Sequence, residues 1–150
     1  MSTAAEDPFD LARFVSAQEP LMREVLAELS SGRKTSHWMW FIFPQLKGLG
    51  FSAMAGYYGI ASRAEAEAYL RHPVLGPRLI ECTKLVNSAN THSAGQIFGD
   101  IDSLKFRSSM TLFAALGPGT PVFAEALEKY FGGKPDSRTL DLLSRPPAPS

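Results

Sequence analysis

The stretch SHWMWFIFPQ, residues 36–45, decides how the whole sequence is interpreted. It contains both tryptophans of the chain and an uninterrupted apolar run, WMWFIF. On a helix, Trp38 lies beside Phe41 on one face, because residues three and four apart are neighbours. His37, Trp40 and Phe41 then share a second face. Such a segment is apolar nearly all round, so we expect it to be buried on most of its sides.

Two interpretations of these aromatic side chains are open. In the first, they form the central core of a small helical domain, which is the usual role of clustered rings. In the second, they line a cleft, because the indole N–H groups, the His37 imidazole and the Gln45 amide all need partners once buried. An aromatic wall with a few oriented polar groups is typical of a small-ligand pocket. Imidazole suits proton transfer near neutral pH, so His37 is also a weak candidate for a general acid or base, or it simply closes the turn at Ser36.

Helix start and stop signals surround this stretch. A capping residue before proline or three residues before glutamate starts a helix, and glycine or proline ends one. The start signals are Asp7 with Pro8, Pro20, Ser36, Ser62 with Glu65, Pro73 or Pro77, Ser93, Asp100 or Asp102, Thr120 with Pro121, and Asp136. The stop signals are Pro20, Gly32, Pro44, Pro73, Gly99, Gly117 to Gly119, and Gly132 with Gly133.

Periodicity does not separate a short helix from a buried strand in the run WMWFIF, but the helical surroundings favour a helix. The following segment, LKGLGFSAMAGYYG, is rich in glycine and is predicted to be an irregular loop lying against the core. The sequence contains no internal repeat and no convincing alternating strand pattern. We therefore predict an all-α fold, a single compact domain of about seven or eight short helices with an irregular Gly-rich loop.

A chain of 150 residues, of which 45% are hydrophobic, fits one globular domain. We place this helical domain at residues 7–143. Residues 1–6 are expected to be a flexible N-terminus. The Pro-rich residues 144–150 are expected to be a disordered tail, because they carry too little apolar surface to fold.

Composition argues against several functional classes. The formal net charge is zero, so the chain lacks the basic surface that duplex nucleic acid requires. Its longest apolar run is too short to span a bilayer and its N-terminus is not a signal peptide, so we expect no membrane association and a cytoplasmic location. The single cysteine, Cys82, is interpreted as a core residue. His37, His72 and His92 stand far apart without acidic or thiol neighbours, and the common nucleotide, hydrolase and protease signatures are absent. We therefore predict no metal and no cofactor.

A second stretch, DIDSLKFRSSMTLF, places cations and hydroxyls on a mostly apolar helix. Lys105, Ser108 and Ser109 share one face, with Arg107 alongside. Such groups must be paired or face a cavity when the helix is buried, and they could cradle a phosphate or carboxylate. Alternatively, Lys105 pairs with Asp102, three residues earlier, and the serines bond back to carbonyl groups one turn before.

Four segments together resemble the bacterial family known as domain of unknown function 1810: HWMWFIFPQLKGLG, AYLRHPVLGPRL, FGDIDSLKFRSSMTLF and FAEALEKYFGGKPDSRTLDLL. The likeness covers nearly the whole predicted domain, and neither aromatic nor basic stretch departs from the family pattern. The resemblance implies a mainly helical cytosolic protein and carries no catalytic assignment. Some members bear the label calpastatin in automatic descriptions. That label has little weight, because calpastatin segments are disordered inhibitor repeats and this chain is predicted to be compact and without repeats.

Three function hypotheses follow. In the first, the protein binds a small planar or anionic ligand in an aromatic and basic cleft where the two stretches meet. The predicted ligand-binding residues are His37, Trp38, Trp40, Gln45, Lys105, Arg107, Ser108 and Ser109. In the second, it is a protein–protein interaction module that presents exposed aromatic surface to a protein partner. In the third, it is an enzyme that uses His37 as a general acid or base.

Overall fold

The computed structural model describes residues 7–144, and the all-α prediction is confirmed within this range. The elements are α1 (Ala12–Gln18), the 3₁₀ turn η2 (Glu19–Leu21), α2 (Met22–Ser31), α3 (Met39–Ile42), α4 (Ala53–Tyr57), α5 (Arg63–Arg71), α6 (Leu75–Asn87), α7 (Ala94–Phe98), α8 (Asp100–Ala114), α9 (Val122–Phe131) and α10 (Ser137–Ser144). One isolated parallel bridge joins Leu46 to Ile60 in the described part of the chain. The predicted flexible N-terminus and most of the predicted tail lie outside the described residues, although Ser144 itself still belongs to α10.

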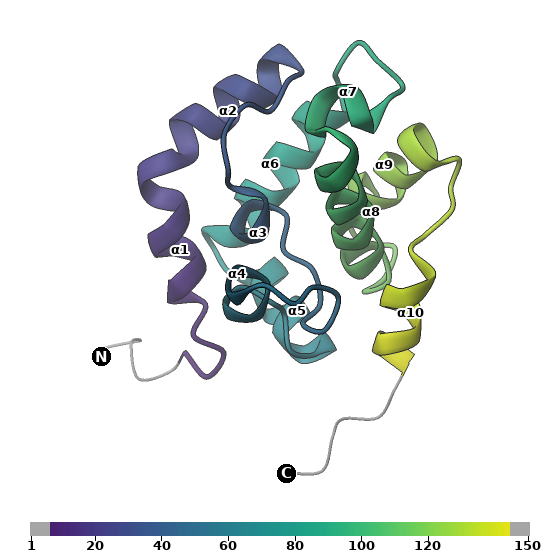
Figure 1. The fold of residues 1–150 in the computed structure, drawn as a ribbon. Coiled ribbons are helices and arrows are strands. Elements are labelled where there is room, and N and C mark those ends of the chain that lie inside the picture. Colours follow the sequence, from purple (N-terminus) through teal and green to yellow (C-terminus); the bar gives the residue numbers. More distant parts are fainter. Residues whose placement is uncertain (1–6, 145–150) are drawn as a thin grey trace.

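Helix α8 is the central element of the arrangement. It contacts α3, α5, α7, α9 and α10, while α6 contacts α2, α5 and α9. Figure 1 shows α1 and α2 along one side of the molecule and α9 and α10 along the other. The short helices α3 and α4 lie between these two sides. None of the helices within residues 7–144 combines the length and the apolar character that crossing a lipid bilayer requires.

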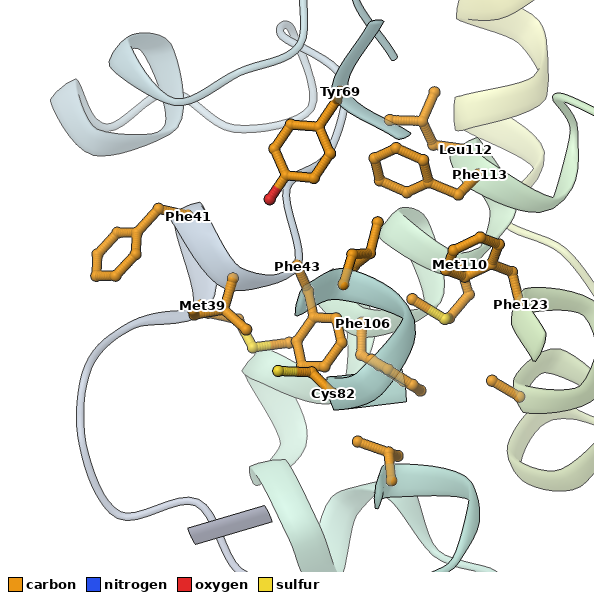
Figure 2. Close-up of a cluster of buried hydrophobic side chains, with 14 of the residues drawn as sticks. Met39, Phe41, Phe43, Tyr69, Cys82, Phe106, Met110, Leu112, Phe113 and Phe123 are labelled. Atoms are coloured by element: carbon orange, nitrogen blue, oxygen red, sulfur yellow. The ribbon is translucent and has the colours of Figure 1, made fainter. Parts of the chain in front are cut away.

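The aromatic stretch enters the core, as the first interpretation of it predicts. Trp38 and Phe43 have no exposed surface. The ring of Phe43 packs edge-on against Phe106 from α8, with centroids 5.0 Å apart, and against Phe98 from α7, at 5.9 Å. Figure 2 shows Phe43 and Phe106 within this cluster, with Tyr69 and Phe113 nearby. Each buried ring hides about 150–250 Å² from water, so these contacts dominate the stability of the fold.

Helices α5 and α6 approach each other closely at Gly76. A Cβ atom there would lie 2.1 Å from the carbonyl oxygen of Leu70, so the position accepts only glycine. Helix α6 begins at Leu75, between the two starts that the sequence left open. Pro77 fits in its first turn, because the missing N–H would have no helical partner there.

Some local predictions were wrong. The helix expected to begin at Pro8 begins at Ala12. Asp10 adopts a positive φ of 52°, which a helical backbone does not allow. Asp7 still accepts hydrogen bonds from the first amides of that region. In the predicted irregular loop, Ser52 caps the short helix α4 by accepting from the N–H of Ala55 at 3.1 Å.

The predicted cap at Ser36 was also wrong. Helix α3 spans only Met39–Ile42, and Trp38 precedes it without a side-chain cap. The hydroxyl of Ser36 donates instead to the carboxylate of Glu28 on α2. The aromatic stretch is therefore held by a contact with the preceding helix, α2, more than by its own helical turn.

Candidate ligand-binding site

The two tryptophans lie in different surroundings. Trp38 is fully buried, and its indole N–H donates to Oε1 of Glu28 at 3.0 Å. Trp40 is half-buried, and its indole N–H has no acceptor among residues 7–144. The Nζ atom of Lys105 lies 4.8 Å from the centroid of the Trp40 ring, which places a cation over the aromatic face. Trp38 is therefore part of the core, and Trp40 is available at the surface.

The carboxylate of Glu28 fixes the chain that leads into α3. It accepts from the backbone N–H of Thr35 at 2.8 Å, from the N–H and hydroxyl of Ser36 at 3.0 and 2.6 Å, and from the indole of Trp38. Burial alone would raise the pKa of this carboxyl group. The hydrogen bonds from Ser36, Thr35 and Trp38 outweigh burial and lower the pKa to about 2. Glu28 was not predicted from the sequence, because its partners lie on a different segment.

An open hollow lies on one side of Trp40, and we call it the His37 hollow. It has a volume of about 520 Å³ and lies between the end of the α2–α3 connection and the first turn of α8. Its lining residues are Lys34, His37, Met39, Trp40, Phe98, Gly99, Asp100, Ile101, Asp102 and Lys105. The imidazole of His37 is exposed there and makes no hydrogen bond to a described residue.

A second hollow, the Gln45 hollow, also borders Trp40 and has a volume of about 480 Å³. Its lining residues are Trp40, Gln45, Leu49, Gly50, Phe51, Ser52, Ala55, Ile101, Leu104, Lys105, Ser108, Asp136 and Arg138. The half-buried amide of Gln45 makes no side-chain hydrogen bond within the described chain. Trp40, Ile101 and Lys105 line both hollows and form the wall between them.

Three charged side chains meet beside this wall. Oδ2 of Asp102 lies 2.7 Å from Nζ of Lys34, and its Oδ1 lies 3.3 Å from Nζ of Lys105. Burial raises the pKa of the Asp102 carboxyl group, but the hydrogen bonds and charges of Lys34 and Lys105 lower it below its ordinary value. The predicted pairing of Lys105 with Asp102 is confirmed.

The two serines of the second stretch have separate environments. Ser108 lines the Gln45 hollow, and its hydroxyl donates to the carbonyl oxygen of Leu104 at 3.1 Å, as the alternative interpretation predicts. Ser109 is fully buried and lines neither hollow, and its hydroxyl has no partner among the described residues. The structure therefore leaves Ser108 near the cleft and places Ser109 in the core.

Arg107 also lies away from the hollows. Its guanidinium donates to the carbonyl oxygens of Lys134 at 3.0 Å and Pro135 at 3.2 Å, and it lies 5.5 Å from the centroid of the Phe131 ring. It fastens the connection between α9 and α10. Of the predicted ligand-binding residues, the structure brings together five along the hollows: His37, Trp40, Gln45, Lys105 and Ser108.

Four further residues of the Gln45 hollow were not predicted. Phe51, Ile101 and Leu104 are 92%, 73% and 62% exposed. Arg138 is exposed and makes no ion pair or hydrogen bond to a described residue. An aromatic residue directly after Gly50 in a glycine-rich segment is a signal for Phe51. No local pattern indicates Arg138, because its position depends on how α10 returns to α8.

The fold and the cleft define a small all-α domain with a concave, partly aromatic surface between α3, α8 and α10. Across residues 7–144, no three histidine, cysteine, aspartate or glutamate side chains are placed to hold a metal ion. Comparison with known proteins places the chain in a family. Residues 8–143 match the family described as protein of unknown function (DUF1810), and the chain belongs to it.

A solved structure supports this membership. The chain is similar to the conserved hypothetical protein Rv1873 from Mycobacterium tuberculosis, whose crystal structure was determined at 1.38 Å. The two share 56% sequence identity with a TM-score of 0.91, and the match covers 93% of this chain and 100% of that chain. No functionally curated protein matches the chain. The resemblance to the family is confirmed.

Proposed function

We propose that the protein binds a small planar or anionic ligand in the cleft that the His37 hollow and the Gln45 hollow form around Trp40. Trp40 supplies a flat aromatic face on which a ring stacks. Gln45 and His37 orient the ligand by hydrogen bonding, and Lys105 attracts its negative part.

One contrast carries the proposal. The indole of Trp38 and the carboxylate of Glu28 are fully matched inside the protein, as polar groups in a core normally are. Trp40 and Gln45, from the same aromatic stretch, have side-chain hydrogen-bonding groups without partners in the described chain. Both side chains border a hollow. A concave apolar wall with a few unpaired polar groups is what a small ligand requires.

The size and charge of the cleft support the same function. Volumes of about 520 and 480 Å³ fall within the range of known small-ligand sites, roughly 300–1,000 Å³. Lys105 is held over Trp40 by Asp102 at 3.3 Å, so its charge is positioned before a ligand arrives. Preorganised groups lose less entropy on binding, which favours affinity.

A thermal-shift panel of planar and anionic small molecules tests the proposal. A ligand at a hundredfold excess over its dissociation constant stabilises the fold by about 2.7 kcal/mol, which raises Tm by roughly 5–10 °C. The shift should be lost in Trp40→Ala. It should be kept in Tyr57→Ala, which removes an exposed aromatic ring that lines neither hollow. A panel without any hit, or an equal shift in Trp40→Ala, contradicts the proposal.

A protein–protein interaction module is the second candidate function. The exposure of Phe51, Ile101 and Leu104 around the Gln45 hollow favours it, because contiguous exposed apolar side chains often mark contact surfaces. The double variant Ile101→Ser with Leu104→Ser separates the two functions. It should abolish binding of a protein partner. A small ligand should bind only a few-fold more weakly, because these two side chains line its site but Trp40 and Gln45 remain in place.

A further inference from the structure

We infer that the Gln45 hollow takes a flat aromatic carboxylate, with its ring held between Trp40 and Phe51 and its carboxylate on Arg138. This inference rests on the proposed function and specifies which hollow is occupied, the chemical class of ligand and its orientation. It also assigns binding roles to Phe51 and Arg138, which are not among the ligand-binding residues predicted from the sequence.

The walls of the Gln45 hollow suit an aromatic ring. The ring of Trp40 and the side chains of Leu49, Ile101 and Leu104 line it, so most of its surface is apolar. A flat ring placed there displaces water from these apolar side chains, and both of its faces become buried. The unpaired amide of Gln45 borders the same space and can bond one polar substituent of the ring.

Phe51 is placed to close over such a ring. It lines the hollow although its side chain is 92% exposed, an unfavourable position for a phenyl group in the absence of a ligand. Its loop contains Gly50 beside it and Gly48, which adopts a positive φ of 103°. Glycine allows backbone changes that other residues resist, so the loop can carry Phe51 onto a bound ring. Stacked or edge-on aromatic pairs then add to the affinity.

The charges of the hollow select a single negative group. Two cations, Lys105 and Arg138, and one carboxylate, Asp136, line it, which leaves a formal charge of +1. The carboxylate of Asp136 is already hydrogen-bonded at the start of α10. Its Oδ2 accepts from the N–H of Thr139 at 3.0 Å and from the hydroxyl of Thr139 at 2.5 Å. Lys105 is bonded to Asp102, so it attracts a negative group through the charge it adds to the hollow and leaves the direct contact to another cation.

Of the two cations that line this hollow, Arg138 is therefore the one whose charged group has no partner among the described residues. A guanidinium binds a carboxylate through two parallel hydrogen bonds. A phosphate dianion carries two negative charges, whereas the side chains that line the hollow carry a formal charge of +1. The Asp136 carboxylate already accepts the N–H of Thr139 in the first turn of α10, so that amide is not available to a ligand.

Calorimetric titration of the full chain with 2-naphthoate tests this inference. The matched probes are 2-naphthamide, which lacks the charge, and cyclohexanecarboxylate, which lacks the flat ring. We expect 2-naphthoate to bind and both other probes to bind about tenfold more weakly or worse. Arg138→Gln should weaken 2-naphthoate by about ten- to a hundredfold and leave 2-naphthamide unchanged. Phe51→Ala should weaken both aromatic probes by about three- to tenfold.

Two control variants remove comparable side chains elsewhere. Arg71→Gln removes an exposed cation at the end of α5, and Met54→Ala shortens an exposed apolar side chain on α4; neither residue lines the Gln45 hollow. Both should bind 2-naphthoate like the unmodified chain. If 2-naphthoate binds equally well to Arg138→Gln and Phe51→Ala, the inference fails while ligand binding at Trp40 stands. It fails in the same way if only other classes, such as nucleotides, shift Tm through Trp40. If no compound of any class binds, the proposed function fails with it.

Discussion

At the level of single residues, Glu28 and Trp40 show why one aromatic segment serves two purposes. The Glu28 carboxylate accepts hydrogen bonds from the N–H groups of Thr35 and Ser36 and from the indole of Trp38. The segment therefore enters the core in one fixed orientation. Two residues further on, Trp40 is turned outward and lines both hollows. The core contact therefore positions the residue that borders the cleft.

The low pKa of Glu28 predicts a specific acid sensitivity. Its folded pKa of about 2 lies below the ordinary value of 4.5, so its contribution to stability is complete above pH 4.5 and is lost as pH falls towards 2. The Glu28→Gln variant should unfold more easily than the unmodified chain at pH 7. Its free energy of unfolding should also change less between pH 4.5 and 2. Urea unfolding at several pH values measures both, and parallel pH curves for the two proteins would rule out the assignment.

At the level of elements, most helices follow from local signals, and the site follows from the contacts between them. The capping pair Ser62 and Glu65 and the glycine after α2 act as the sequence indicates. The short helix α4 was missed because the glycines of the surrounding segment suggest a loop. Helix α3 lacks the expected cap because Ser36 bonds to Glu28. Local propensity is a weak guide wherever a tertiary contact satisfies the same group.

Helix α10 is tied to α8 by one hydroxyl group, and this tie positions Arg138. The hydroxyl of Thr111 donates to the carbonyl of Arg107 and accepts from the N–H of Asp136, both at 2.8 Å. Thr111→Val keeps the shape but leaves that N–H unpaired, so we expect about 1–2 kcal/mol of destabilisation. Amide exchange at the start of α10 should become faster.

Thr83→Val is the matched control for this prediction. Thr83 is equally buried, but its hydroxyl only bonds to the carbonyl of Leu79 within α6. We expect its stability to change by less than about 0.5 kcal/mol, with unchanged exchange in α10. Equal effects of the two substitutions would show that Thr111 has no special role in holding α10.

At the level of the whole molecule, the sequence predicts the class of fold and half of the cleft. The all-α architecture and the burial of the aromatic stretch follow from periodicity and capping. Trp40, Gln45, Lys105 and Ser108, four of the residues predicted from the sequence to line a cleft, border the Gln45 hollow. Arg138 could not be predicted, because only the packing of α10 against α8 brings it there.

The core that organises this arrangement also protects the single thiol. Cys82 on α6 is 1% exposed, and burial, with the nearby charge of Glu81, raises its pKa to about 12. Only the thiolate reacts, so the native protein should resist an aromatic disulfide reagent at pH 7–8. Adding urea should accelerate labelling in step with unfolding. Rapid labelling of the native chain would mean that the core opens locally around α6.

The different surroundings of the two indoles also give the protein an internal pair of optical reporters. Trp38, shielded from water, should emit at shorter wavelength than Trp40, and a dissolved quencher such as acrylamide should reach chiefly Trp40. Emission from a single unlabelled sample therefore distinguishes an event at the cleft, which alters the red component, from loss of the fold, which alters the blue one.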